Sequence, residues 1–132
     1  MLTYLLVAAG GALGSVARFW FSGFVSDRMG ETFPWGTLLV NITGSFVIGF
    51  FFTLTGPGGQ WLAQSNTRIF FMIGICGGYT TFSSFSLNTL NLMQSGQWLR
   101  AGANCLASVV LCLVAVWLGH ILAMGLNSTK GN

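Results

Sequence analysis

Four long stretches without a charged side chain divide this sequence and limit what it can fold into. Each can hold a helix of about 20 residues, the length that crosses the hydrocarbon core of a bilayer. In soluble domains about a quarter of the residues are charged, whereas here 5% are charged and 53% are hydrophobic. The pattern predicts an all-α integral membrane protein with four transmembrane helices in one domain over residues 1–132. The uncharged stretches are residues 1–17, 32–67, 69–99 and 101–129.

Glycines, prolines and the few charges set the expected helix ends. The first stretch lacks a basic leader and a small-residue cleavage site and continues through Arg18, which favours a retained helix over a signal peptide. Both carboxylates, Asp27 and Glu31, are expected in the first loop. The expected helices cover residues 2–24, 34–55, 68–94 and 99–125, and the third is interrupted at residues 77–81.

The basic residues are balanced between the two sides of the expected bundle. Arg28 and Arg100 lie on one side, and Arg68 and Lys130 on the other. Because an excess of Lys and Arg in short loops sets orientation, this tie predicts a weak preference and insertion both ways. Four helices also enclose little interior, so a pore is expected between subunits. We therefore expect an antiparallel, dual-topology homodimer.

Composition argues against several function classes. The chain has three cysteines, and all fall inside expected helices: Cys76, Cys105 and Cys112. Their positions and their odd number argue against a disulfide framework or a zinc site. The five basic residues are scattered, so no basic patch exists for nucleic acid, and no nucleophile and base pair indicates an enzyme. No Asp, Glu or Lys lies within an expected helix, and we interpret His120 as structural. Passive conduction is therefore favoured over proton-coupled transport.

The segment GGYTTFSSFS, residues 77–86, interrupts the apolar pattern of the third helix. Non-helical backbone at membrane depth survives only where it is buried in protein or lines a polar path. The half-helix before a break ends in free carbonyls that suit a cation, and the half-helix after it begins with N–H groups that suit an anion. We expect the carbonyls of Gly77, Gly78 and Thr80 to hold a small hard cation such as sodium, while Thr81 begins the second half.

Phe82 and Phe85 share one face of the second half-helix, beside the hydroxyls of Ser83 and Ser84. The electropositive edges of phenyl rings can contact an anion in the absence of a formal charge. The alternative is that both rings simply pack between helices. The aromatic and hydroxyl residues together favour a path for a small anion.

Polar residues on the other helices extend this expected path. The side chain of Asn41 is expected either to form a hydrogen bond between helices or to contact an ion. Arg18 either extends to the lipid headgroups or attracts anions to a water-filled vestibule. The path residues expected outside the third helix are Arg18, Thr37, Asn41 and Ser108.

Three motifs resemble, in order and spacing, the signatures of the small bacterial fluoride channels of the CrcB or Fluc family. They are GGALGSVAR at residues 10–18, GTLLVNITGSFVIG at residues 36–49 and GICGGYTTFSSFS at residues 74–86. The resemblance implies a multi-pass protein of the bacterial plasma membrane, a dual-topology antiparallel homodimer with two fluoride pores and a central structural sodium ion. It also implies efflux of cytoplasmic fluoride, which enters cells as neutral HF and dissociates inside.

The resemblance further implies a role for each matching residue. Family members commonly carry a glutamate where this chain has Asn88, and a hydroxyl where it has Cys112, whose thiol is a weaker hydrogen-bond partner. The implied roles are sodium ligation by the carbonyls of Gly77 and Thr80, facing phenylalanines at Phe82 and Phe85, a pore asparagine at Asn41, a hydroxyl track at Ser83 and Ser84, and a vestibule arginine at Arg18.

Two other functions compete with a fluoride channel. A dual-topology multidrug exporter of the small four-helix kind would share the length and the charge tie. Such exporters rely on a glutamate in the first helix, and none is present here. A structural membrane subunit without an ion path would tolerate apolar residues at Asn41, Ser83 and Ser84.

Overall fold

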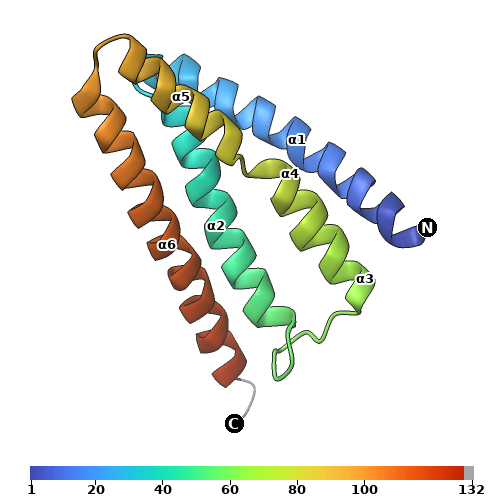
Figure 1. The fold of residues 1–132 in the computed structure, drawn as a ribbon. Coiled ribbons are helices and arrows are strands. Elements are labelled where there is room, and N and C mark those ends of the chain that lie inside the picture. The colour runs from blue at the N-terminus through green and yellow to red at the C-terminus, as the bar shows by residue number, and fades with distance from the viewer. Residues whose placement is uncertain (130–132) are drawn as a thin grey trace.

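The computed structural model describes residues 1–129, and the chain forms a bundle of long helices with short connections (Figure 1). Four helical stretches are long and apolar enough to cross a membrane, which confirms the prediction of an all-helical membrane protein with four spans. Lys130, one member of the expected charge tie, lies outside the described residues. The elements are α1 (Leu2–Met29), α2 (Trp35–Thr55), α3 (Ser65–Arg68), the π-helical η1 (Ile69–Cys76), α4 (Gly77–Tyr79), α5 (Phe82–Gln94) and α6 (Trp98–Ser128).

The first helix is longer than expected, and this corrects the placement of one carboxylate. α1 continues to Met29 and ends at Gly30, whose φ of 80° is a left-handed conformation that suits glycine. Asp27 therefore lies in the last turn of α1 rather than in the loop, while Glu31 does lie in the loop. At about 1.5 Å per residue a helix of this length exceeds the roughly 30 Å hydrocarbon core, so its polar end extends beyond it.

Glycine contacts set how closely the helices approach. α1 packs on η1 and α4, where a Cβ atom added to Gly14 would lie 2.2 Å from the carbonyl oxygen of Ile75. α2 packs on α6, where a Cβ at Gly119 would lie 2.2 Å from the oxygen of Phe46. Small residues that permit such approach are typical of membrane helix contacts, because lipid supplies no hydrophobic force between helices. Gly10 and Gly14 of α1 are both buried.

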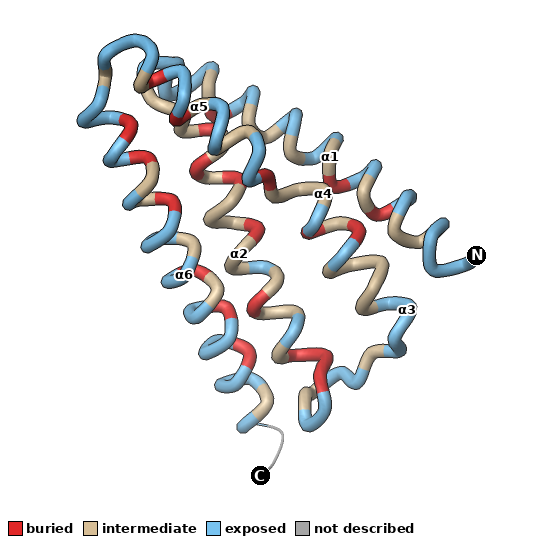
Figure 2. Tube along the Cα trace, in the orientation of Figure 1, coloured by how far each residue is buried: buried red, intermediate tan, exposed pale blue. Residues whose placement is uncertain are grey.

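The single chain buries few large side chains. The buried residues of α6 lie on the side that faces α2, and most of the remaining surface of α6 is exposed (Figure 2). Large apolar residues such as Phe82, Leu99 and Leu106 are exposed. An apolar exterior of this kind requires lipid or another subunit as its surroundings.

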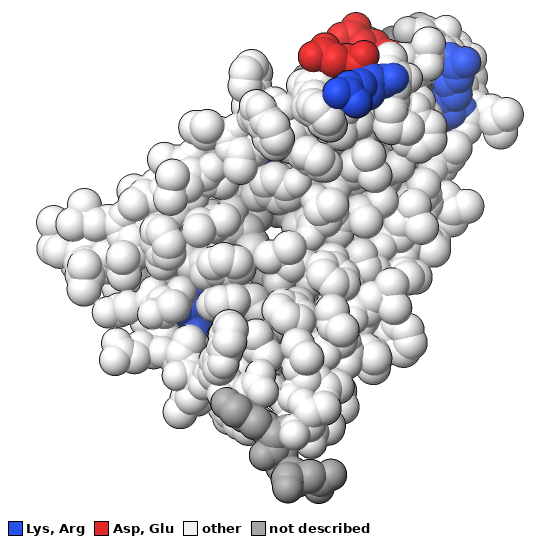
Figure 3. Space-filling view, turned by 180° about the vertical axis from the view of Figure 1, so that it is seen from behind, with Lys and Arg blue, Asp and Glu red and all other residues white. Residues whose placement is uncertain are grey.

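Charged side chains gather at one end of the bundle. The reverse view shows acidic and basic side chains together at that end, and the face below them is almost entirely uncharged (Figure 3). Asp27, Arg28, Glu31 and Arg100 belong to the α1–α2 and α5–α6 connections or the helix turns next to them. The distribution leaves an uncharged band of the kind that hydrocarbon requires.

Candidate functional site

The third membrane-length stretch, Ser65–Gln94, is interrupted near its midpoint. α4 ends at Tyr79, Thr80 and Thr81 are extended with ψ angles of 154° and 113°, and α5 begins at Phe82. The interruption is narrower than expected. Gly77 remains helical, with φ −65° and ψ −38°, because the N–H of Thr80 still donates to the Cys76 carbonyl at 3.0 Å.

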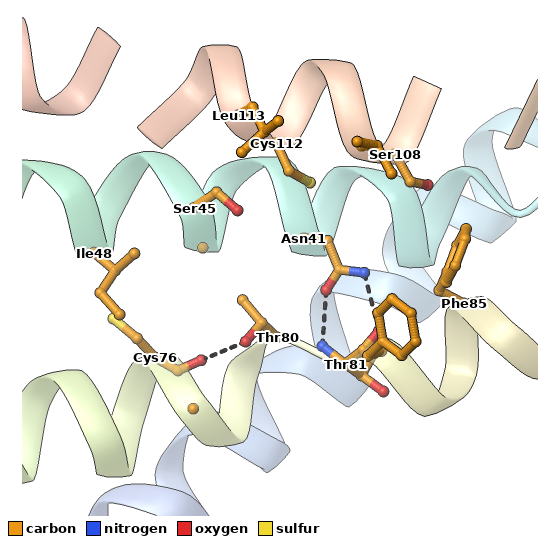
Figure 4. A pocket seen from close by; sticks show the side chains of 14 residues that line it. Asn41, Ser45, Ile48, Cys76, Thr80, Thr81, Phe85, Ser108, Cys112 and Leu113 are labelled. Atoms are coloured by element: carbon orange, nitrogen blue, oxygen red, sulfur yellow. Dashed lines mark hydrogen bonds between the residues drawn. The ribbon is translucent and has the colours of Figure 1, made fainter. Parts of the chain in front are cut away.

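Asn41 of α2 holds the extended backbone from the side. Its Nδ2 donates to the carbonyl of Thr81 at 3.0 Å, and its Oδ1 accepts from the N–H of Thr81 at 2.7 Å (Figure 4). A backbone N–H only donates and a carbonyl only accepts, so the amide orientation follows from this pairing. One N–H of Nδ2 remains free of these two bonds.

Thr81 starts the second half of the broken stretch, as predicted. Its Oγ1 accepts from the N–H of Ser84 at 3.1 Å and caps α5. Thr at this position is a preferred N-cap because its oxygen takes one of the N–H groups that a helix start leaves unpaired. The geometry is local, which explains why the sequence was sufficient to predict it.

α2 approaches the interruption closely at two further positions. A Cβ at Gly44 would lie 2.3 Å from the Cγ2 of Thr80. Tyr79 and Thr43 are joined through their hydroxyls at 2.9 Å, and Thr43 directs its own proton to the carbonyl of Leu39 at 2.8 Å. The pair links α2 to the end of α4. The sequence did not reveal this pair, because its members are 36 positions apart.

A cavity of about 450 Å³, the central cavity, lies beside the interruption and is bounded by α2, α5 and α6 (Figure 4). The Phe82 and Phe85 rings lie 5.2 Å apart at 48°, a tilted pair, and the side chain of Phe82 is 77% exposed in the single chain. Polar and apolar groups meet here, with no carboxylate in the lining. The predicted path residues that it brings together are Asn41, Phe82, Phe85 and Ser108.

A second cavity of about 520 Å³, the α1 cavity, lies on the other side of Thr81, which lines both cavities. It brings together three more of the predicted residues, Arg18, Thr37 and Ser84, and its lining also includes the carboxylates Asp27 and Glu31. Its serines on α1 were missed by the sequence interpretation: Ser15, Ser22 and Ser26. Their signal was available, since residues 15, 18, 22 and 26 recur at helical spacing on one face.

Ser83 lines neither cavity, and its Oγ lies 3.3 Å from the Oγ1 of Thr81. Asn88, at the position where a glutamate is common, donates through Nδ2 to the Oγ1 of Thr37 at 2.9 Å. Cys112 lines the central cavity as a free thiol. His120 has a structural partner, with its Nδ1 2.7 Å from the Oγ1 of Thr53.

A buried chain of hydrogen bonds leads from Ser108 of α6 away from the central cavity. The Oγ of Ser108 lies 3.5 Å from the Oδ1 of Asn104, and the Nδ2 of Asn104 donates to the Oγ1 of Thr89 at 2.9 Å. All three residues are buried. Ser108 is therefore both a cavity residue and the end of this chain.

The interruption removes the helical donors of two backbone carbonyls, those of Gly77 and Thr80. Their i+4 donors are the N–H groups of Thr81 and Ser84, which donate instead to the Oδ1 of Asn41 and the Oγ1 of Thr81. These are the two carbonyls to which the family resemblance assigns sodium ligation. Carbonyl oxygens suit hard cations, and unpaired ones at membrane depth need such a partner.

The sequence profile of the family described as CrcB-like protein, Camphor Resistance (CrcB), matches residues 5–120, which include every residue of both cavities. The chain belongs to the CrcB-like family. It is a multi-pass membrane protein of a bacterial channel family, and that family is not one of enzymes.

Several members of the CrcB-like family are similar over their whole length. A protein of Opitutus terrae named fluoride-specific ion channel FluC is 64% identical over 132 residues, 100% of both chains. Proteins of the same name from Rhodospirillum rubrum and Methylocella silvestris are 60% and 56% identical, over 96% and 98% of this chain and 98% and 99% of their own. The likeness therefore extends through both cavities and the interruption.

Proposed function

We propose that this protein is a fluoride-selective passive ion channel that lowers cytoplasmic fluoride by efflux. The observation that carries the proposal is the full-length similarity to proteins named fluoride-specific ion channel FluC, at up to 64% identity. The site agrees chemically. The lining of the central cavity has amide, hydroxyl and aromatic groups and no carboxylate, which suits a small anion.

Fluoride enters from the α1 cavity, where Arg18 raises the local anion concentration and the serines of α1 replace part of the hydration shell. It then passes Thr81, which lines both cavities, to reach the free N–H of Asn41, the hydroxyl of Ser108 and the ring edges of Phe82 and Phe85. Thr37, Ser83 and Ser84 belong to the same proposed path. Each contact beyond Arg18 is neutral, so an ion is held weakly enough to leave.

The working form in this proposal is an antiparallel homodimer in the bacterial plasma membrane. Gly77 and Phe82 are exposed on the single chain, although each lies within a span. Lipid can pair neither the Gly77 carbonyl nor the other groups at the interruption. A second copy against this face would cover the central cavity and bring two sets of carbonyls together, and the charge tie supports opposite orientations of the two copies.

The Gly77 and Thr80 carbonyls of both copies would hold a structural sodium ion at the dimer centre. Their fit rests on the loss of their helical donors, because the N–H groups of Thr81 and Ser84 donate to side chains instead. The partial negative charge of these oxygens would attract a sodium ion. The bound ion would then link the interruptions of the two copies.

Purified protein in liposomes loaded with fluoride provides the test, with a fluoride electrode to measure efflux. Efflux much faster than from empty liposomes, with no comparable chloride flux, is the expected result. Flux equal to that of empty liposomes, or equal for the two anions, would refute the proposal. Drug transport driven by a proton gradient, without passive fluoride flux, would instead favour the exporter.

Phe82→Ile tests the aromatic edges within the same assay. The change removes the electropositive ring edge but keeps an apolar side chain, so efflux should fall at least about ten-fold if an edge contact of roughly 1.5 kcal/mol is lost. Phe50→Ile is the matched control, because Phe50 lies on α2 and lines neither cavity. Equal flux from both variants would remove the aromatic role.

A further inference from the structure

The two carbonyls proposed for the cation are free because two particular N–H groups are diverted from them. In an unbroken helix the N–H of residue i donates to the carbonyl of residue i−4. Thr81 would then donate to Gly77, and Ser84 would donate to Thr80. Both of these bonds are replaced here.

Each diversion is made by one side chain. The N–H of Thr81 donates instead to the Oδ1 of Asn41 at 2.7 Å. The N–H of Ser84 donates instead to the Oγ1 of Thr81 at 3.1 Å. The two carbonyls that lose their donors are those of Gly77 and Thr80.

We infer that Asn41 and Thr81 are positioning residues for the cation site, because their side chains take the N–H groups that would otherwise close the helix over the Gly77 and Thr80 carbonyls. Asn41 therefore has two functions on two faces of one amide. Its Oδ1 accepts the N–H of Thr81, which leaves the Gly77 carbonyl available to the cation. Its Nδ2 has a second N–H that is available to an anion in the central cavity, which Asn41 lines. The cation site and the anion path are coupled through this residue. The inference rests on the proposed function.

Sodium-specific stabilisation of the purified protein in detergent tests it without measuring transport. The midpoint of thermal unfolding is followed against sodium concentration, with N-methylglucamine replacing sodium at constant ionic strength. Thr81→Val keeps the shape of the side chain but removes the acceptor for Ser84. The sodium concentration for half-maximal stabilisation should rise by about ten-fold or more, because a carbonyl is withdrawn from a charged ligand. Asn41→Ala should have the same effect through Gly77.

Conservative variants separate positioning from general packing. Thr81→Ser retains the acceptor and should keep the wild-type sodium midpoint. Asn41→Asp retains an acceptor for the N–H of Thr81 and should also keep the sodium response, while fluoride efflux falls because the Nδ2 donor is gone. Thr43→Val is the matched control, since its hydroxyl contacts Tyr79 and its own helix and takes neither diverted N–H.

Unchanged sodium midpoints in Thr81→Val or Asn41→Ala would overturn the inference, as would an equal shift in Thr43→Val. If Asn41→Ala fails to fold, the comparison of Thr81→Val with Thr81→Ser decides. Absence of any sodium-specific stabilisation in the wild type would overturn both this inference and the proposed cation site. Fluoride efflux from liposomes would in that case still stand as evidence for the channel, so the two failures are distinguishable.

Discussion

Replacing Gly14 by alanine tests the contact that holds α1 against the helix before the interruption. The added Cβ would lie 2.2 Å from the carbonyl oxygen of Ile75, which is 1.2 Å short of the 3.4 Å at which ordinary contact begins (3.4 − 2.2 = 1.2). Its next neighbour is the backbone nitrogen of Tyr79, at 2.8 Å. Both neighbours are backbone atoms, so the clash is relieved only by moving one helix away from the other.

Overpacking of this kind costs about 1–3 kcal/mol, and rigid backbone neighbours place Gly14→Ala at the upper end of that range. Alanine regains about 1 kcal/mol through its higher helix propensity. The net expectation is a loss of about 2 kcal/mol, or roughly 30-fold in the folding equilibrium. Gly11→Ala is the matched control on the same helix, because a Cβ there meets nothing within 4 Å. It should be neutral or slightly stabilising.

Reversible unfolding by sodium dodecyl sulfate in mixed micelles, followed by the fluorescence of the five tryptophans, measures the difference. Gly14→Ala should unfold at a lower mole fraction of the denaturing detergent than the wild type, and Gly11→Ala should not. Equal midpoints for Gly14→Ala and the wild type would mean that α1 can move away from the helix before the interruption without a loss in the free energy of unfolding. Equal destabilisation by both variants would show that the clash with Ile75 is not the cause.

Two further predictions concern arginines. Arg18→Gln should lower fluoride efflux several-fold at about 10 mM salt and much less at about 1 M, where the screening length falls from about 30 Å to about 3 Å; an effect independent of salt would contradict the role of Arg18 in attracting anions. Arg68→Met should lower the free energy of unfolding in detergent by about 1–3 kcal/mol, because the Nη1 of Arg68 donates to the Oγ1 of Thr55 at 2.7 Å and to the carbonyl of Phe52 at 3.3 Å near the end of α2. Arg68→Lys should recover part of that loss, and an unchanged midpoint in Arg68→Met would show that these bonds contribute nothing.

Local sequence patterns predicted the helices well and their ends less well. The four spans follow from uninterrupted apolar stretches, and Thr81 as a cap follows from short-range hydrogen bonding. The end of α1 was placed too early, because a helix continues past the membrane whenever its residues permit and hydropathy marks only the hydrocarbon boundary. The serines of α1 were overlooked because each one alone is unremarkable in an apolar helix, and only their common face reveals a polar cavity wall.

The interruption itself divides what the sequence determined from what tertiary structure decided. Composition alone determined that residues 77–86 are a weak point in an apolar helix, since glycines and hydroxyl residues compete poorly for a continuous helical hydrogen-bond ladder. It did not determine that Gly77 stays helical while Thr80 and Thr81 become extended. That outcome depends on Asn41, 40 positions away, which accepts the N–H of Thr81 in place of the Gly77 carbonyl. Competition between two acceptors for one donor is settled only when packing brings α2 alongside the broken helix.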